Sequence, residues 1–210
     1  MRQIISDEFV NALASYWEFT STTVVYPPEK SLEYVTLGLI SEINEFANNS
    51  FALLIGHQDG ALEVEESVLD LERAKLLLEL GDILYYVTRL CIHLGYSSVQ
   101  SFLVNVKYYP ESEGIKSLEE SDFFTTYMAL NFASGELAGL IKKYVRGDSN
   151  YQDLSILQVF CESYLIIMFL TIDELAYDLN SDLKTVMDDN TNKLTKRKNA
   201  GTIQGDGDFR

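Results

Sequence analysis

Apolar residues recur at intervals of three and four positions along most of the chain. This spacing is that of an α-helix that buries one face, so the pattern predicts an all-α protein. Clusters of proline, glycine and small polar residues interrupt the pattern and predict loops between the helices. The helices are expected over residues 6–20, 31–48, 69–94, 97–108, 122–145, 154–179 and 181–198.

A weak internal repeat relates the two halves of the chain. Residues 37–43 and 130–137 have similar patterns, and aligning them places Glu42 over Glu136. A lone pair of helices cannot bury its own apolar face, so we predict two helical modules that pack as an intrachain pseudo-dimer. A chance likeness of two amphipathic helices is the alternative. The expected units are residues 1–112, residues 113–200 and a flexible glycine-rich tail, residues 201–210.

Two pairs of acids stand out in the first half of the chain: Glu42 with Glu45, and Glu79 with Asp82. A spacing of three places both members of a pair on roughly one side of a helix. Around the second pair, residues 76–90 are apolar nearly all round. A buried ionised carboxylate without a partner is very unfavourable, so these acids need a cation or a proton.

The cations close to these acids in the sequence are too few and too poorly placed to neutralise both pairs: Arg73, Lys75 and Arg89. Four carboxylates from two neighbouring helices would instead form an all-oxygen site of the kind that Mg²⁺ or Mn²⁺ prefers, above all when substrate phosphates complete the coordination. The alternative is a helix pair with acids on its solvated rim.

Other catalytic motifs are absent from the sequence. Neither His57 nor His93 follows a Glu by three residues, as a di-iron helical bundle would require, and both histidines are expected to be structural or exposed. The sequence also lacks the glycine-rich phosphate loops, the zinc-protease motif and the serine-hydrolase elbow. Magnesium at a carboxylate cluster therefore favours phosphoryl or nucleotidyl hydrolysis.

The composition limits which binding partners and which cellular compartment are expected. Thirty-two acidic residues oppose 16 basic ones, a net charge of −16, so binding to nucleic acid or to an anionic membrane is not expected. Cys91 and Cys161 lie far apart in apolar segments, as buried free thiols in a reducing compartment would. Acids near the N-terminus interrupt any signal peptide, and the apolar run 164–170 is too short to span a bilayer. We therefore expect a cytoplasmic protein.

Three segments of the chain resemble the MazG-like all-α NTP pyrophosphatases, a superfamily that includes the all-α dUTPases. They are residues 34–45 with the ExxE pair, residues 79–86 with the ExxD pair, and residues 190–210 with an Asn-x-x-Lys-Leu-x-x-Arg helix and a glycine-rich tail. The resemblance implies two tandem MazG-like modules and cleavage of a nucleoside triphosphate between its α and β phosphates, which yields a monophosphate and pyrophosphate. It also implies the catalytic residues that hold Mg²⁺ and position the attacking water: Glu42, Glu45, Glu79 and Asp82.

Basic residues in the second half are candidates for binding the phosphates. Asn190, Lys193 and Arg197 share one side of a helix, where they could meet phosphate oxygens or complement the helix dipole. The family likeness favours a tail that closes over the substrate with Arg210. Lys143 belongs to a basic cluster that could also reach the triphosphate, or that simply ends its helix.

The two modules depart from the family pattern in complementary ways. The second keeps Glu136 but has Gly139 where the first has Glu45, and the first lacks the Lys-Leu-x-x-Arg sequence that the second keeps. These losses predict one composite site per chain, with metal ligands from the first half and cations from the second. The remaining alternatives are a dUTPase-like enzyme selective for one base and a degenerate module that binds a nucleotide or a protein without catalysis. Pairing of two chains as a homodimer stays open.

Overall fold

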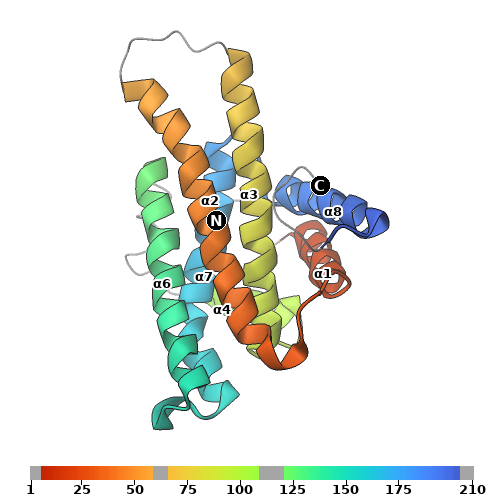
Figure 1. The fold of residues 1–210 in the computed structure, drawn as a ribbon, viewed down its shortest axis with the longest axis vertical. Coiled ribbons are helices and arrows are strands. Elements are labelled where there is room, and N and C mark those ends of the chain that lie inside the picture. The colour runs from red at the N-terminus through yellow and green to blue at the C-terminus, as the bar shows by residue number, and fades with distance from the viewer. Residues whose placement is uncertain (1–5, 59–65, 109–120, 204–210) are drawn as a thin grey trace.

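The computed structural model describes residues 6–58, 66–108 and 121–203, and over these residues it consists of helices and loops without a strand. The prediction of an all-α fold is confirmed. Within the described ranges the seven α-helices (Figure 1) are α1 (Asp7–Ser21), α2 (Ser31–Gln58), α3 (Glu66–His93), α4 (Val99–Tyr108), α6 (Phe123–Arg146), α7 (Leu154–Asp178) and α8 (Leu183–Ala200). Two short 3₁₀ helices, Pro28–Lys30 and Ser149–Tyr151, precede α2 and α7.

Local sequence signals account for where most helices begin and end. The residue before α1, α6, α7 and α8 is Ser or Asp, and its side chain accepts a hydrogen bond from a backbone N–H of the first turn. Gly147 and Gly201 end α6 and α8 in the left-handed conformation, with φ of 81° and 71°, which glycine adopts without strain. The predicted helices therefore agree closely with the observed ones, apart from the end of α2.

α2 continues to Gln58, beyond the end predicted at residue 48. Polar residues in this part of α2 have partners within the helix or on its neighbour. The Ser50 hydroxyl donates to the Phe46 carbonyl at 2.7 Å, and Asn49 Nδ2 donates to Glu79 on α3 at 3.1 Å. Packing along α3 thus overrides the local preference of Asn and Ser for helix ends.

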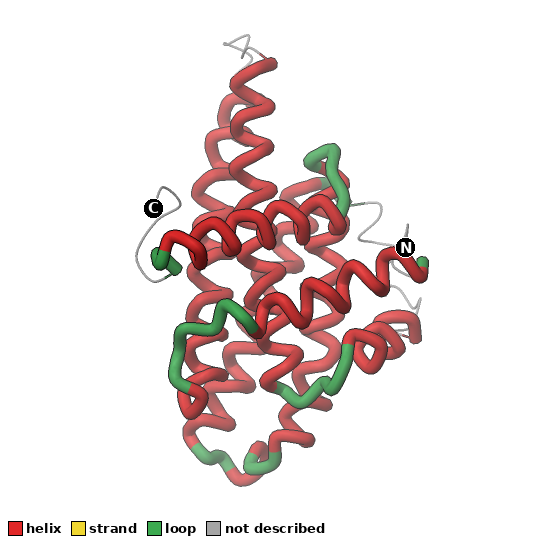
Figure 2. The backbone as a smooth tube through the Cα atoms, turned by 90° about the vertical axis from the view of Figure 1, so that its right-hand side faces the viewer, coloured by secondary structure: helices red, strands yellow, loops and turns green. Residues whose placement is uncertain are grey.

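Two long antiparallel hairpins form the body of the fold. α2 pairs with α3 and α6 pairs with α7, and the hairpins pack so that α2 lies against α6 and α3 against α7. The colour order in Figure 1 shows that α2 runs opposite to α6 and α3 runs opposite to α7. In both Figure 1 and Figure 2, the α2–α3 hairpin extends at one end beyond the rest of the bundle.

The shorter helices cross between the two hairpins. α8, near the end of the chain, packs on α3 of the first hairpin. α4, which follows the first hairpin, contacts α7 of the second: the rings of Phe102 and Phe169 lie 5.5 Å apart, and Asn105 donates to Glu162. α1 contacts α3, α4 and α8. Residues from both ends of the sequence therefore meet on α3, where the candidate site lies.

One core extends through both hairpins, with α7 contributing to it along most of its length. Cys91 and Cys161 are buried in this core as free thiols, as predicted. Within the described residues, α7 is long and apolar enough to cross a membrane by those two criteria alone. Half of its apolar stretch is buried inside the bundle, and the core helix of a soluble protein meets the same criteria.

Candidate functional site

Three carboxylates from α2 and α3 converge on the first hairpin. One oxygen each of Glu42, Glu45 and Glu79 lies within 4.8 Å of the others. Glu42 and Glu45 are three positions apart on α2 and face α3 together, whereas Glu79 projects from α3. Glu45 is exposed, Glu42 is half-buried and Glu79 is only 5% exposed, so the cluster runs from solvent into the core.

The charge of the fourth predicted acid, Asp82, affects the pKa of Glu42 in this cluster. Burial, followed by the charges of Asp82, Glu45 and Glu79, raises the pKa of Glu42 from 4.5 to about 8, against an opposing effect of Lys193. All four acids singled out in the sequence are thus close enough to interact. A carboxyl group with this pKa stays largely protonated at neutral pH, because burial and then the neighbouring negative charges disfavour its ionised form.

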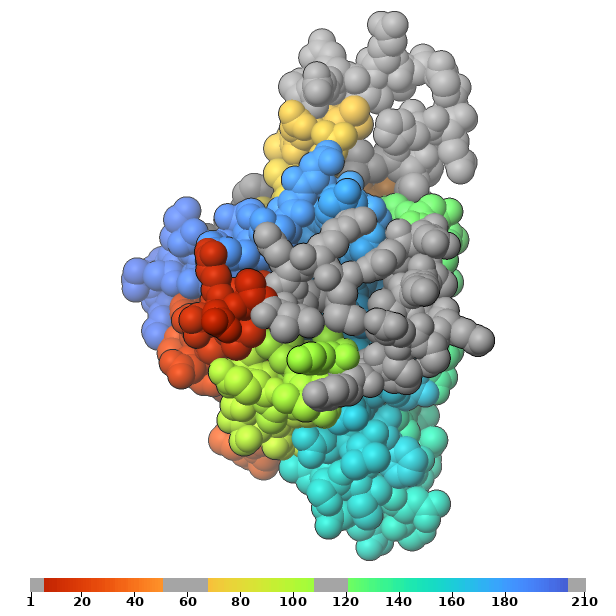
Figure 3. Space-filling model, turned by 180° about the vertical axis from the view of Figure 1, so that it is seen from behind, coloured from red at the N-terminus to blue at the C-terminus, as the bar shows by residue number. Residues whose placement is uncertain are grey.

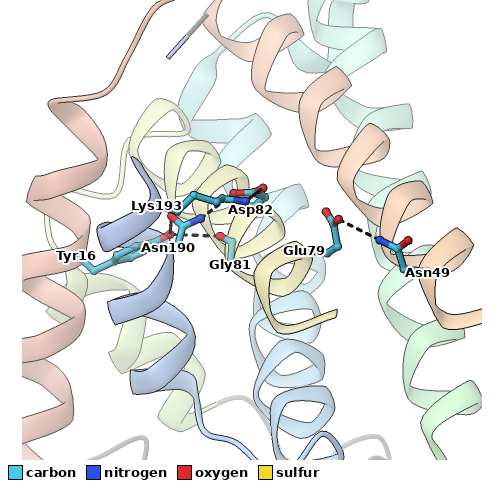
Figure 4. A network of polar contacts seen from close by, with 7 residues as sticks. All are labelled: Tyr16, Asn49, Glu79, Gly81, Asp82, Asn190 and Lys193. Carbon is cyan, nitrogen blue, oxygen red and sulfur yellow. Dashed lines mark hydrogen bonds and ion pairs between the residues drawn. The ribbon is translucent and has the colours of Figure 1, made fainter. Parts of the chain in front are cut away.

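Asp82 is bound by two residues of α8 (Figure 4). Asn190 Nδ2 donates to Asp82 Oδ1 at 2.7 Å, and Lys193 Nζ forms an ion pair with Asp82 Oδ2. The side chains of this ion pair are 11% and 14% exposed, so the pair is largely shielded from water. Lys193, predicted to bind phosphate, therefore also supplies positive charge to Asp82 from 111 residues away in the sequence.

The cations that neighbour the acids in the sequence bind other groups, as expected. Their partners are Asp70 and Glu72 for Arg73 and Lys75, and Ser21, Tyr26 and His93 for the buried Arg89. Burial and the charge of Arg89 lower the pKa of His93 to about 4, so this histidine is neutral at neutral pH. Among the described contacts, Lys193 of α8 supplies positive charge to Asp82.

Tyr16 of α1 fixes the orientation of the Asn190 amide. The Tyr16 hydroxyl donates to Asn190 Oδ1 at 2.8 Å and lies 3.4 Å from the carbonyl oxygen of Gly81. Burial, and then the charge of Asp82, raise the pKa of Tyr16 well above its usual value, so the phenol keeps its proton and donates. Because Asn190 Oδ1 accepts, its amide nitrogen is directed at Asp82. No motif in the sequence marks Tyr16 for this role.

Gly81 allows α8 to approach α3 closely. A Cβ added at Gly81 would lie 2.9 Å from the Cβ of Asn190, closer than such atoms pack. Gly81→Ala is therefore expected to lower the free energy of unfolding by about 1–3 kcal/mol, measured by urea denaturation. An increase of up to about 1 kcal/mol in the free energy of unfolding is the usual effect of Gly→Ala at an open helical position. Such an increase would show that α3 and α8 do not make this contact.

Asn49 also contacts the cluster, although it was not among the predicted residues. Its Nδ2 donates to Glu79 Oε1 at 3.1 Å (Figure 4). A signal for it exists in the sequence, because Asn49 follows Glu45 by four positions and Glu42 by seven and so shares their face of α2. Helical spacing extended beyond the acidic residues would have found it.

The aromatic ring of Tyr86 lies beside Glu42. It packs against the backbone of Gly38 on α2, where any Cβ would overlap the ring. Burial raises the pKa of Tyr86, and the charges of Tyr34 and Glu42 add to this effect. Gly38, one turn before Glu42, thus makes room for a flat aromatic surface next to the acids.

A groove of about 680 Å³ lies between α3 and α8, next to the acids. Its α3 side is apolar and includes Leu77 and Leu78, and its α8 side carries Lys193, Lys196 and Arg197. Lys193 borders the groove and binds Asp82, so the groove and the acids are joined. Lys193 and Arg197 were predicted from their spacing, and Lys196 lies between them on the same helix.

No protein-family model matches the chain, and no solved structure matches it. Over 108 residues the chain is 33% identical to the Gene 37 protein of Mycobacterium phage L5, and the match covers 87% of the phage protein and 49% of this chain. The chain belongs to the family of that phage protein. The likeness to the Gene 37 protein thus spans most of the phage protein but only about half of this chain.

Some residues singled out in the sequence have no described contact with the acids, or lie outside the described residues, in this member of the Gene 37 family. Lys143 lies in the last turn of α6, with its Nζ 5.5 Å from the ring centre of Tyr151, and no described contact joins it to the acids. Glu136 is exposed on α6. Arg210 and the side chain of His57 lie outside the described residues. The site that the structure assembles is therefore built from α1, α2, α3 and α8.

Proposed function

We propose that the protein is a magnesium-dependent nucleoside triphosphate pyrophosphohydrolase, which cleaves between the α and β phosphates and releases a monophosphate and pyrophosphate. One observation carries this proposal: four carboxylates from α2 and α3 lie beside a groove that carries Lys193, Lys196 and Arg197. Such a site can hold a divalent cation together with the polyphosphate whose charge the cation neutralises. The MazG-like resemblance of the same residues supports the same reaction.

The donor set fits Mg²⁺, and Mn²⁺ could replace it. The candidate ligands are all carboxylate oxygens, which hard divalent cations prefer, and Glu42, Glu45 and Glu79 each offer one oxygen within 4.8 Å of the others. The raised pKa of Glu42 supports this assignment, because a bound cation would let the carboxyl group ionise. Bound magnesium would supply positive charge to the phosphates and acidify water at the site.

The residues of the groove would bind and orient the substrate. Lys193 and Lys196 can contact phosphate oxygens as point charges, and Arg197 can do so as a planar fork. Asn190, held by Tyr16, positions Asp82 on the other side of Lys193. The family likeness adds a tail that closes over the substrate with Arg210, which stays a prediction.

We further propose that the chain contains two MazG-like modules, divided near residue 112, that exchange their last helices. Asn190 on α8 donates to Asp82 on α3, and Asn105 on α4 donates to Glu162 on α7. The two contacts are similar, and they join corresponding helices of the two hairpins. This correspondence supports an internal duplication in which the first half kept the metal ligands and the second half supplies the cations.

The cytoplasm is the proposed location. Cys91 and Cys161 are free and buried, which suits a reducing compartment. The net charge of −16 argues against nucleic acid and anionic membranes as partners. The partner we propose is therefore a nucleoside triphosphate that binds together with its metal ion.

Pyrophosphate release from the common ribo- and deoxyribonucleoside triphosphates, together with dUTP, tests the proposed reaction. We expect release from at least one of them that requires Mg²⁺ or Mn²⁺ and stops when a chelator is added. A strong preference for dUTP would identify a dUTPase-like enzyme. If folded protein released no pyrophosphate from any of these nucleotides with magnesium present, the proposal would be wrong.

A nucleotide-binding module without catalysis is the second candidate. The ion pair between Lys193 and Asp82 favours it, because this lysine occupies an oxygen that a metal ion would use. Tight binding of a nucleotide by calorimetry, without turnover in the same solution, would distinguish this function from the first.

A further inference from the structure

Lys193 lies where the acid cluster and the groove between α3 and α8 meet. Its Nζ forms an ion pair with Asp82 Oδ2, and its side chain also lines the groove together with Lys196 and Arg197. The ion pair is largely shielded from water, whereas Lys196 is exposed. Figure 3 shows from behind that α8 lies at the edge of the molecule beside α1. One lysine of α8 therefore belongs to both parts of the candidate site.

Both carboxylate oxygens of Asp82 have a partner on α8, and the two partners differ in how easily they can move. Asn190 donates to Oδ1, but Asn190 is only 1% exposed and its own oxygen accepts from the Tyr16 hydroxyl (Figure 4). Lys193 reaches Oδ2 through a flexible four-carbon stem that also borders the groove. A cation that comes to Asp82 would therefore displace Lys193 and leave Asn190 in place.

The groove offers Lys193 a second carboxylate. Asp189 also lines the groove, is exposed, and precedes Lys193 by four positions on α8. An acid and a lysine at this spacing can form an ion pair on the surface of a helix. The same helix already contains a pair four positions apart, because Lys184 donates to Asp188 at 2.9 Å. Lys193 can therefore leave Asp82 without losing a carboxylate partner.

We propose that Lys193 is an exchangeable cation of the site: it binds Asp82 while no metal ion is bound, and it moves into the groove when magnesium reaches the acids. This exchange rests on the metal site of the proposed function. Without the metal ion, the contact is favoured because breaking it would leave a shielded carboxylate without its lysine. A bound cation would supply that positive charge and would repel the ammonium group of Lys193.

The exchange would couple metal binding to substrate binding. While Lys193 is held by Asp82, its charge is already neutralised, so a nucleotide without a metal ion meets weaker positive charge in the groove. After the exchange, Lys193 would join Lys196 and Arg197 on the same side of α8, where all three can face phosphate oxygens. The site would thus favour the metal-bound form of its substrate.

The reactivity of lysines toward an amine-acylating reagent tests the exchange in the full chain. Lys193 should react slowly while it is shielded and paired with Asp82, and faster once it lies in the groove. We expect magnesium chloride alone to raise the acylation rate of Lys193 at least about fivefold, measured by peptide mass spectrometry against NaCl at equal ionic strength. The rate for Lys184, paired with Asp188 on the same helix, should change less than about twofold.

Magnesium affinity measured by calorimetry is the second test and does not depend on turnover. Lys193→Met removes the cation that competes for Asp82, so we expect it to lower the dissociation constant for magnesium at least about tenfold. Lys196→Met removes the same charge from the same groove, without a described contact to Asp82, and should lower this constant less than about threefold. Equal effects of the two substitutions would overturn the exchange, because general repulsion alone would then explain them.

The outcomes distinguish the exchange from the proposed reaction. Magnesium-dependent pyrophosphate release without a gain in Lys193 reactivity would overturn the exchange and leave the reaction standing. A gain in Lys193 reactivity, in folded protein that hydrolyses no nucleotide, would support the exchange and contradict the reaction. If calorimetry detected no binding of magnesium up to about 10 mM, both would be wrong.

Discussion

Glu79→Gln is expected to abolish pyrophosphate release, with kcat lowered at least about 100-fold. Glu79 is the most buried acid of the cluster, at 5% exposure, and it lies within reach of Glu42 and Glu45. Glutamine keeps the shape of the side chain, and its carbonyl oxygen can accept the same hydrogen bond from Asn49. It lacks the negative charge that makes a carboxylate a strong magnesium ligand. Timed assays of pyrophosphate release with the preferred nucleotide measure the effect.

Glu136→Gln is the matched control for this substitution. Glu136 is exposed on α6 and corresponds in the sequence repeat to Glu42, yet it has no place in the proposed site. The kcat of the Glu136→Gln variant is expected to stay within about twofold of the wild-type value. Removal of a buried charge is not expected to unfold the protein, and a thermal melt of Glu79→Gln checks this. If folded Glu79→Gln kept the wild-type kcat, the proposed role of the acid cluster in catalysis would be wrong.

Below about pH 6.5 the effects of His93 and Glu42 on the free energy of unfolding oppose each other, because the pKa of the buried His93 is lowered to about 4. As the pH rises from about 6.5 to about 8, the free energy of unfolding is expected to fall, with Glu42 as the main cause. Its pKa is about 8 in the folded chain against an ordinary 4.5, so the folded state keeps a proton that the unfolded state has released in this range. Rising pH therefore favours unfolding. The 1.5 pH units between 6.5 and 8 set an upper limit of about 2 kcal/mol on this loss.

Urea denaturation at pH 6.5 and pH 8 measures this loss of stability. Glu42→Gln cannot ionise and is expected to remove most of the pH dependence, whereas Glu136→Gln should retain it. If Glu42→Gln kept the full wild-type dependence, the raised pKa of Glu42 would not be its source.

Magnesium is expected to offset the loss at pH 8. A cation at the cluster favours the ionised form of Glu42, so its stabilising effect should be larger at pH 8 than at pH 5. At a magnesium concentration of about ten times the dissociation constant, binding would add about 1.4 kcal/mol to the free energy of unfolding. This corresponds to a rise of about 3–6 °C in Tm for a chain of this size. NaCl at equal ionic strength is the control, since screening alone stabilises an acidic chain. Equal stabilisation of wild type and Glu42→Gln would argue against a metal ion at this residue.

Most helix boundaries were predictable because their signals are local. The side chains of Ser6 and Asp122 cap the first turns of α1 and α6, and Gly147 provides the left-handed residue that ends α6. The end of α2 was not predictable in this way, because it depends on a contact with another helix. Asn49 would suit a helix end, but it binds Glu79 across the hairpin instead.

The acid cluster was predictable to the extent that it depends on helical spacing. Glu42 and Glu45 lie on one face of α2, and Glu79 faces them because the two helices are paired. The partners of Asp82 were not predictable as contacts, because they require α8 to fold back onto α3 over more than 100 residues of sequence. The structure places Lys193 against Asp82, but the composite site expected from the complementary losses stays a prediction. Tyr16 gave no signal in the sequence.

Hydrolysis in water labelled with heavy oxygen tests the proposed reaction most directly, because it identifies both the bond that breaks and the phosphorus atom that water attacks. With magnesium and the preferred nucleotide, we expect wild-type protein to yield pyrophosphate and a nucleoside monophosphate that carries the label, and Glu79→Gln to yield neither. Release of orthophosphate with a nucleoside diphosphate, or no hydrolysis by the folded wild type, would contradict a magnesium-dependent pyrophosphohydrolase at this site. Label in the pyrophosphate would contradict attack of water on the α-phosphate.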